Sequence, residues 1–422
     1  MIKLLIIADD FTGALDTGVH FSQCGAITHV ITGNRFDIAN YCDSCDVLVV
    51  DAETRHVSAE KAYANVYDIV AQAMTLQIPH IYKKTDSALR GNVGAEIAAV
   101  LDASKEDAIP FMPAFPQMER NTIQGIHYIA GVPVDQSVFG KDPFEPVRHS
   151  RIPELISEQT LWPVQSYPAI SVGDELPKER GIWVFDASCL EDLVSVGNCL
   201  KKAHRLHIMA GCAGFGAVLP SLLSLDAGIP RPVPPLDSEF TIICGSVNPI
   251  TISQILYAKD HGAQHKWLTP EQKLDPNYWD SLQGKEKLQE LNQILEIYPL
   301  RILDTNDWDN NTKTVDYAAQ NNMTIQDVRK AVSGTIGHLV SQLFSHPKIG
   351  TILITGGDTL RQCMDYMGVH GIEPLCELDS GVVLSRFEYS GVTRYVISKS
   401  GGFGSEDLFI RLSEKISGQS RK

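Results

Sequence analysis

The densest group of polar side chains in the chain is KKTDSALRGN, at residues 83–92. It follows the apolar run IPHIY, which is typical of a buried strand, and a helical pattern resumes directly after it. Ammonium groups beside hydroxyls suit a small carboxylate, and an arginine can clamp one with two parallel hydrogen bonds. A solvated loop would explain one of these lysines but not the whole group. The predicted substrate-binding residues here are Lys83, Lys84, Thr85, Asp86 and Arg90.

Two carboxylates, Asp9 and Asp10, follow the apolar run LLIIA near the start of the chain. Adjacent carboxylates at a strand end repel each other unless a cation, hydroxyl groups or a helix N-terminus satisfies them. One alternative needs no ligand, because Asp10 or Thr12 could cap the following helix. We expect one carboxylate to cap and the other to face a polar ligand. Arg55, after a third strand-like run, is a further candidate for binding a carboxylate.

Three glycine turns in the second half of the chain each join a strand-like run to a helix-like run: CGSVN, TGGDT and SGGFG. Bare glycine lets backbone N–H groups approach phosphate, and a helix N-terminus favours negative charge. One such turn is weak evidence, since glycine also serves ordinary turns, but three in one region predict a nucleotide site. GxxxxGK[ST] is absent, and no first-turn GxGxxG favours a dinucleotide. The predicted nucleotide-binding residues are Ser246, Gly356, Gly357, Asp358, Thr359, Gly401 and Gly402.

The elements that must hold these residues alternate between short apolar runs and helical patterns. This alternation predicts βαβ units and an α/β fold in which each sheet is mainly parallel or mixed and is flanked by helices. Such folds bind ligands beyond the carboxyl ends of their strands, which is where the polar groups fall. A strand over 107–112 leads into a loop with Arg120 and His127, and a lone histidine is usually structural.

A proline-rich segment, GIPRPVPP at 228–235, interrupts the alternation. Proline-rich segments are stiff and exposed, which is typical of a linker. We therefore predict two domains, at 1–235 and 236–422, with the charged cluster in the first and the glycine turns in the second. The active site is expected in the cleft between them, with domain closure excluding water.

The composition excludes several classes of protein. The formal net charge of −15 argues against a nucleic-acid partner, which needs a basic face. Nine scattered cysteines, with a lone CxxC at Cys42 and Cys45, favour free thiols over a disulfide framework or a zinc site, so we predict no metal ligands. A short, quickly acidic start and the absence of a long apolar run predict a cytoplasmic protein without membrane contact.

The sequence resembles the four-carbon acid sugar kinase family. The matching stretches span nearly the whole chain in family order, and within the family they are more similar to the D-threonate and D-erythronate kinase branch than to the 3-oxo-tetronate branch. GCAGFG departs from the family in having Cys212 where a residue such as serine is more usual. The matching stretches are ADDFTGALD, KKTDSALRGNVGAEI, GCAGFG, CGSVN, TGGDT and SKSGGFGSED.

The resemblance implies that the domain at 1–235 binds the sugar acid and the domain at 236–422 binds the nucleotide. It also implies transfer of the ATP γ-phosphoryl group to the terminal 4-hydroxyl of a tetronate. Carried over residue by residue, it implies substrate contacts at Asp9, Arg55 and 84–86, and nucleotide contacts at Ser246, 356–359 and Gly401. D-threonate or D-erythronate is the expected substrate. The alternatives are a 3-oxo-tetronate 4-kinase and a non-catalytic sensor of nucleotide and sugar acid. A homodimer is compatible with the sequence.

Phosphoryl transfer depends mainly on alignment and charge neutralisation. We expect Arg55, Lys84 and Arg90 to hold the substrate, and Asp9 or Asp10 to orient the attacking hydroxyl and accept its proton. Asp358 is a rival for that role because it lies beside the predicted phosphates. Mg²⁺ is expected as a cofactor because ATP normally arrives with it and the ion needs few protein ligands.

Overall fold

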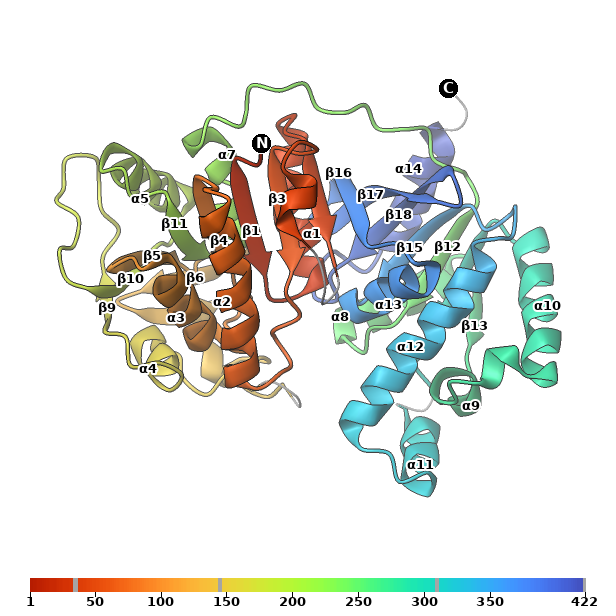
Figure 1. Cartoon of the computed structure of the whole chain (residues 1–422). Coiled ribbons are helices and arrows are strands. Elements are labelled where there is room, and N and C mark those ends of the chain that lie inside the picture. The colour runs from red at the N-terminus through yellow and green to blue at the C-terminus, as the bar shows by residue number, and fades with distance from the viewer. Residues whose placement is uncertain (33–36, 143–145, 308–310, 420–422) are drawn as a thin grey trace. The chain divides into compact units, whose positions relative to one another are not determined.

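The computed structural model describes residues 1–32, 37–142, 146–307 and 311–419. It divides into two compact units, Met1–Arg231 and Pro232–Lys422. Each unit is an α/β domain with its own sheet, helices and hydrophobic core (Figure 1). The two-domain α/β prediction is therefore confirmed.

The first domain is built on a parallel sheet with the strand order β2-β3-β1-β4-β11-β5-β10-β9. Ala8, the last residue of β1, pairs with Asp51 at the end of β3 and with Lys84 at the end of β4. Three strands therefore end side by side at one edge of the sheet. The strands are β1 (Leu4–Ala8), β2 (Thr28–Ile31), β3 (Val47–Asp51), β4 (His80–Lys84), β5 (Ala108–Met112), β9 (Val164–Tyr167), β10 (Gly181–Phe185) and β11 (Ile208–Gly211).

Helices cover both faces of this sheet, and their starts follow from local sequence. Asp10 caps the first helix, because its Oδ1 accepts a hydrogen bond from the backbone N–H of Gly13 at 3.1 Å. Ser58 caps α2 through a hydrogen bond from Lys61 N. The helices are α1 (Phe11–Gln23), α2 (Ala59–Thr75), α3 (Val93–Ser104), α4 (Ile152–Ser157), α5 (Leu190–Lys202), α6 (Ala213–Gly216) and α7 (Leu219–Leu222), with 3₁₀ turns at η1 (Ile38–Tyr41), η2 (Pro116–Met118) and η3 (Val134–Gln136).

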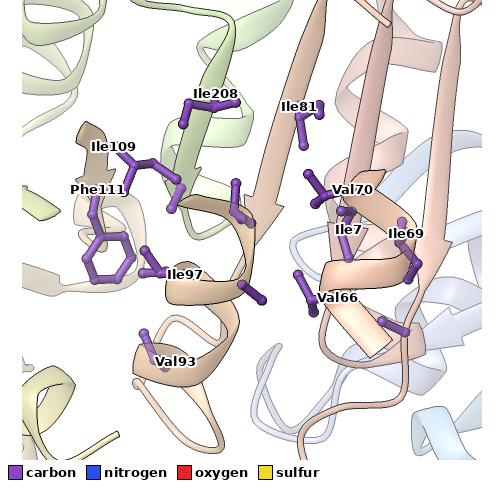
Figure 2. Packing of buried hydrophobic residues seen from close by; sticks show 14 of the residues in the cluster. Ile7, Val66, Ile69, Val70, Ile81, Val93, Ile97, Ile109, Phe111 and Ile208 are labelled. Carbon is purple, nitrogen blue, oxygen red and sulfur yellow. The ribbon is translucent and has the colours of Figure 1, made fainter. Parts of the chain in front are cut away.

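Figure 2 shows the core between the sheet and helices α2 and α3. Val66 and Val70 of α2 lie over Ile7 of β1, while Ile97 of α3 lies near Phe111 of β5. All five side chains are fully buried. Full burial of a side chain of this size stabilises the fold by about 1.5–3 kcal/mol, so this core fixes the strand ends that carry the polar residues.

A small antiparallel sheet, β6-β7-β8, stands apart from the main sheet of the first domain. Its first turn is held by Asp186, whose carboxylate accepts hydrogen bonds from Gln124 N and Gly125 N at 2.7 and 2.9 Å. The sequence pattern did not predict this sheet. Its strands are β6 (Arg120–Ile123), β7 (Ile126–Ile129) and β8 (Val132–Pro133).

The second domain has a mixed sheet with the strand order β13-β14-β12-β15-β18-β17-β16. The first five strands are parallel, and β18, β17 and β16 form an antiparallel meander. Figure 1 shows this meander in blue beside α14. The strands are β12 (Phe240–Cys244), β13 (Gln264–Trp267), β14 (Leu300–Asp304), β15 (Thr351–Thr355), β16 (Gly371–Asp379), β17 (Val382–Tyr389) and β18 (Val392–Lys399).

The helices of the second domain pack on a second core, in which Ile255, Leu353, Leu384 and Phe409 belong to one buried cluster. The helices are α8 (Pro249–Asp260), α9 (Pro270–Leu274), α10 (Leu282–Ile297), α11 (Thr312–Gln320), α12 (Ile325–Leu343), α13 (Gly357–Met367) and α14 (Leu408–Gln419), with a 3₁₀ turn at η4 (Tyr278–Asp280).

Two glycines meet where the first domain ends. A Cβ added at Gly25 would lie 2.2 Å from the carbonyl carbon of Gly228, and one added at Gly228 would lie 2.5 Å from Gly25 O. Gly25 also has φ +85°, which other residues rarely adopt. This contact is possible only between two residues without side chains. The exposed segment 229–235 begins directly after it.

No helix in the described ranges combines the length and the apolar character that a membrane crossing requires.

Candidate functional site

The first polar group lies at the carboxyl edge of the β3-β1-β4 sheet. Asp9 directly follows β1, and Thr85 directly follows β4, so the register of Ala8 with Lys84 makes them neighbours. Arg55 reaches the same edge, because its backbone N–H donates to Asp9 O at 3.2 Å. The structure thus brings together residues that the sequence placed in three separate segments.

Arg55 is the centre of this edge and binds carboxylates of its own domain. Its Nε donates to Asp9 Oδ2 at 2.7 Å, and its Nη1 and Nη2 donate to Asp10 at 2.8 and 2.7 Å. Asp86 Oδ1 lies 3.6 Å from Nη2. Burial alone would lower the pKa of Arg55, but these acids outweigh it and hold the pKa well above its usual range. Asp10 thus both caps α1 and binds Arg55. We predicted that one of the two carboxylates caps the helix, and Asp10 is that one.

Arg90 also binds an acid of the chain. Its Nε and Nη2 donate to the two oxygens of Asp86 at 2.8 and 3.0 Å, which is the bidentate geometry. Burial would raise the pKa of Asp86, but Arg90 and Arg55 together hold it well below the ordinary value. Both arginines that we expected to clamp a substrate carboxylate therefore already clamp protein carboxylates.

Lys84 and Thr85 differ from the arginines. Within the residues that the structure describes, Lys84 Nζ makes no hydrogen bond or ion pair, although the side chain is buried. The ammonium lies 2.6 Å from the position that a Cβ at Gly13 would take, and it interacts electrostatically with Asp9. Thr85 Oγ1 and Asp9 Oδ1 are also buried without a hydrogen-bond partner in this part of the molecule. Three polar atoms at one sheet edge are therefore available to a ligand.

Lys83 lies away from this group, inside the domain. Its Nζ donates to Ile7 O at 3.2 Å and to Lys84 O at 2.8 Å, and it forms an ion pair of 3.0 Å with Glu96 Oε2. The side chains of Lys83 and Glu96 are 0% and 1% exposed. Burial raises the pKa of Glu96, and the charge of Lys83 offsets part of that rise. This placement is structural, in contrast to the substrate contact that we predicted for Lys83.

Two residues outside the predicted set belong to the same electrostatic environment. Burial raises the pKa of Asp16. The positive charge of Lys84 lowers this pKa in part, and the negative charge of Asp10 raises it further. Arg120 Nη1 donates to Ser87 Oγ and interacts electrostatically with Asp16. Asp16 lies on α1 within the ADDFTGALD segment, where its spacing of six residues from Asp10 gave no sign of this neighbourhood.

His127 has the structural role expected of a lone histidine. It is fully buried, with Nδ1 3.1 Å from Thr122 Oγ1 and Nε2 2.9 Å from Ser87 O. Burial lowers its pKa to about 4. The imidazole is therefore neutral at physiological pH and braces the loop that contains Ser87.

The second polar group lies at the carboxyl edge of the second domain's sheet. Cys244 at the end of β12 pairs with Thr355 at the end of β15 and with Asp304 at the end of β14. Thr355 in turn pairs with Lys399, the last residue of β18. The three predicted glycine turns therefore leave neighbouring strands at one edge, as a nucleotide site requires.

The turn after β15 presents main-chain amides. Gly356 has φ +93°, a conformation that favours glycine, and α13 starts there without a side-chain cap. Uncapped N–H groups at a helix start favour an anion. Asp358 in the first turn instead binds Arg329, whose Nε and Nη2 donate to its Oδ2 at 2.8 and 2.5 Å.

The turns after β12 and β18 lie against each other. A Cβ added at Gly401 would lie 2.8 Å from Ser246 Oγ and 3.2 Å from Asn248 Cβ. Asn306, after β14, donates from Nδ2 to Ser246 O at 3.1 Å and was not predicted. Little in the sequence indicated Asn306, because the segment that follows β14 lacks the glycine turn that marks the other three strand ends.

All nine cysteines, including Cys42 and Cys45, are free thiols in the structure. Among the described residues, no three His, Cys, Asp or Glu side chains are placed to hold a metal ion. The site chemistry visible in the chain is therefore that of charged side chains in one domain and of main-chain amides in the other.

Comparison with known families assigns both domains. Residues 4–219 match a family model described as a sugar-binding N-terminal domain, and residues 241–409 match one described as a nucleotide-binding C-terminal domain. Both matched ranges fall within the two structural units.

Two of three curated kinases of four-carbon sugar acids match nearly the whole chain, and the third matches 60% of it. A D-threonate kinase from Salmonella typhimurium is 27% identical over 421 residues, which is 96% of each chain. A D-erythronate kinase from Heliobacterium modesticaldum is 27% identical over 268 residues, 60% of each chain. A 3-oxo-tetronate kinase from Salmonella typhimurium is 23% identical and covers 99% of this chain and 100% of its own.

Solved structures show the same fold. One from Salmonella typhimurium LT2 has a TM-score of 0.77 at 20% identity and covers 98% of this chain and 100% of its own. One from Haemophilus influenzae has a TM-score of 0.68 at 20% identity with the same coverage. At this identity the likeness supports the fold and nothing further.

Proposed function

Since the chain belongs to the four-carbon acid sugar kinase family, we propose that it transfers the γ-phosphoryl group of ATP to the terminal 4-hydroxyl of a four-carbon sugar acid. The observation that carries this proposal is the similarity to a curated D-threonate kinase over 96% of both chains. The two sheet edges support it, because one gathers buried charged side chains and the other gathers glycine turns. D-threonate and D-erythronate are the proposed substrates.

The proposed substrate contacts are Lys84, Thr85 and Asp9. Lys84 is a buried cation without a hydrogen-bond partner among the described residues, which suits the substrate carboxylate. Thr85 Oγ1 and Asp9 Oδ1 suit its hydroxyl groups. In this proposal Arg55, Arg90 and Asp86 form the charged frame that orients these groups.

Asp9 is the proposed orienting group for the attacking hydroxyl. Its Oδ2 is held by Arg55 at 2.7 Å, so that its Oδ1 is fixed in direction. Burial would raise the pKa of Asp9, but Arg55, Lys84 and Lys83 hold it below the ordinary value. A weakly basic carboxylate is sufficient where phosphoryl transfer depends on alignment. Asp10 and Asp358 are less suited, because Arg55 and Arg329 bind them.

The proposed nucleotide contacts are the amides of the glycine turns. Gly356, Gly357 and Thr359 line the start of α13, and Ser246 lies beside Gly401. These neutral donors suit the phosphates of ATP. Mg²⁺ is proposed to arrive bound to those phosphates and to neutralise part of their charge, since it keeps several waters and needs few protein ligands.

The experiment that tests this function is an ADP-release assay with D-threonate, D-erythronate, L-threonate and 3-oxo-tetronate. We expect turnover with one of the first two. Preference for 3-oxo-tetronate would instead identify the chain as a 3-oxo-tetronate kinase, like a relative that is 23% identical to it. Binding of nucleotide and sugar acid without ADP release would identify a sensor instead, and nicotinamide reduction in a parallel assay with NAD would identify a dehydrogenase.

The role of Asp9 is tested by Asp9→Asn, which keeps the side-chain volume. We expect kcat to fall by about 10²-fold or more, the loss that follows when a reacting group is no longer held in line. Full turnover by this variant would remove Asp9 from the chemistry.

A further inference from the structure

The segment 400–405 follows β18, and its carbonyl groups turn toward buried side chains rather than outward. Lys399 Nζ donates to Ser400 O at 2.9 Å and to Gly401 O at 3.2 Å. Thr251 Oγ1 of α8 donates to Gly401 O at 2.9 Å and accepts from Lys399 Nζ at 3.2 Å. Lys399 and Thr251 therefore hold the first two carbonyls of the segment together.

Gln254 holds the rest of the segment. Its Nε2 lies 2.9, 3.0 and 2.9 Å from the carbonyl oxygens of Phe403, Gly404 and Ser405. Gln254 follows Thr251 by three residues on α8, so both side chains project from the same face of the helix. Both are fully buried, which shields these hydrogen bonds from water.

The direction of these carbonyls decides the direction of the amides. Across a trans peptide bond the C=O and the following N–H point in opposite directions. Because the carbonyls of Ser400 and Gly401 point at Lys399, the N–H groups of Gly401 and Gly402 point away from it. In the described part of the chain no oxygen accepts from the N–H groups of Gly401, Gly402 or Gly404. Successive amides that point outward form an anion-binding concavity.

The charge of Lys399 adds to this preference. The side chain is 0% exposed, and its three hydrogen-bond partners are all neutral. Burial lowers its pKa to about 8, and the charge of the Cys244 thiolate would raise it. Burial has the opposite effect on the thiol of Cys244 and raises its pKa, so the thiol is neutral at physiological pH. A buried cation without an anionic partner favours an anion nearby.

We propose that Lys399, Thr251 and Gln254 are positioning residues that fix the main chain of 400–405 with its amides outward, so that they receive the phosphates of the bound nucleotide. The inference rests on the proposed function for the identity of the anion. Lys399 itself stays beneath the segment and acts on the nucleotide through the amides and through its charge.

The main test is Lys399→Met, which keeps the length of the side chain and removes its charge and hydrogen bonds. Titration calorimetry would measure the Kd for ATP, and we expect it to rise by about tenfold or more. KM for the sugar acid would change less than twofold. The matched control is Arg301→Met, which removes another fully buried cation near the opposite end of the same sheet. It would lower Tm without changing the Kd for ATP.

The pH profile separates the charge of Lys399 from a packing role. The bound phosphates favour the ammonium form, so ATP affinity should be constant below about pH 8 and fall by up to about tenfold per pH unit above it. The phosphates are already fully ionised in that range, since their last pKa is about 6. Lys399→Met should show a flat profile, and Lys399→Arg should keep tight binding at high pH.

Thr251→Val and Gln254→Leu keep the inference testable if Lys399→Met does not fold. Each should raise the Kd for ATP by several-fold while Tm stays near that of Arg301→Met. Wild-type Kd in all three variants, or losses no larger than in the Arg301 control, would overturn the inference. Because ATP binding is measured directly, a protein that binds ATP but phosphorylates no sugar acid would refute the proposed function and leave this inference open to its own test.

Discussion

Two buried lysines occupy similar places in the two domains and differ in one respect. Lys83 near the end of β4 and Lys399 at the end of β18 each donate to two main-chain carbonyls and are each 0% exposed. Lys83 also has a carboxylate partner, Glu96, at 3.0 Å, whereas the hydrogen-bond partners of Lys399 are neutral. A cation paired within the fold serves stability. A cation without such a pair is available to an anionic ligand.

The same contrast extends to the surroundings of each lysine. At the first domain's sheet edge Arg55 and Arg90 form ion pairs with several acids, and His127 supports this edge in its neutral form. The second domain's edge presents main-chain amides and contains Lys399, whose pKa is lowered to about 8 by burial. We therefore expect acid to disturb the first edge and base to disturb the second.

The largest expected effect is that of Arg55→Met. The variant leaves Asp9, Asp10 and Asp86 without the cation that binds them. Removing one member of a buried charge network destabilises a fold by about 3–5 kcal/mol, and sugar-acid phosphorylation should be lost with it. Urea unfolding followed by tryptophan fluorescence measures the first effect. Arg55→Lys should recover part of the stability, and a change below about 1 kcal/mol in Arg55→Met would contradict the network.

The next largest effect is a loss of stability at acid pH, caused by the buried imidazole of His127. Its unfolded pKa of 6.5 falls to about 4 in the fold, so the folded state binds fewer protons than the unfolded state between these values. Stability should be complete above about pH 6.5 and fall by about 3 kcal/mol in total as the pH drops to about 4. Urea unfolding at several pH values measures it. His127→Gln should lose most of this dependence of the unfolding free energy on pH. If the dependence is unchanged in the variant, it arises from other titratable groups.

The Lys83–Glu96 pair gives a smaller, more specific effect. Lys83→Met and Glu96→Gln each leave one polar partner buried without the other, and the double variant removes both charges. We expect the double-mutant cycle to give a coupling energy of about 2 kcal/mol, with Kd for ATP unchanged throughout. A coupling near zero would mean that Lys83 is no better paired than Lys399 and would remove the contrast.

The smallest effect is expected for Asp358→Asn. Its ion pair with Arg329 is partly exposed, with the aspartate side chain 51% accessible, so its loss should cost about 1 kcal/mol or less. Turnover should stay within a few-fold of wild type if Asp9 orients the hydroxyl. Steady-state kinetics decides this, and a loss of kcat as large as that of Asp9→Asn would return Asp358 to the chemistry.

Much of this organisation is predictable from the sequence, because it depends on local patterns. Apolar runs that end at Asp9 and Asp51 in the first domain, or at Gly245 in the second, indicate parallel strands whose ends meet at one edge of that domain's own sheet. The strand that the pattern predicts over 107–112 is present as β5, Ala108–Met112. Glycine turns between strand and helix are likewise visible without a structure.

Pairing between distant residues is not predictable in this way. Arg55 and Asp9 are 46 positions apart, and only the fold shows that they bind each other. The sequence suggested that Lys83 and Lys84 were equivalent, yet successive strand residues point to opposite faces, so one lies inside and the other at the site. The β16–β17 hairpin was missed because its alternation is interrupted by bulges.

The contact between Gly25 and Gly228 has a consequence for the tether between the domains. Because neither residue has a side chain, the chain is pinned to the turn after α1 until Gly228, and the proline-rich stretch that follows has a fixed starting point and a fixed usable length. Replacing either glycine with alanine would push the two backbone segments apart, because the added Cβ would lie within 2.5 Å of the facing backbone. The glycine pair thus fixes the point at which the proline-rich stretch leaves the first domain.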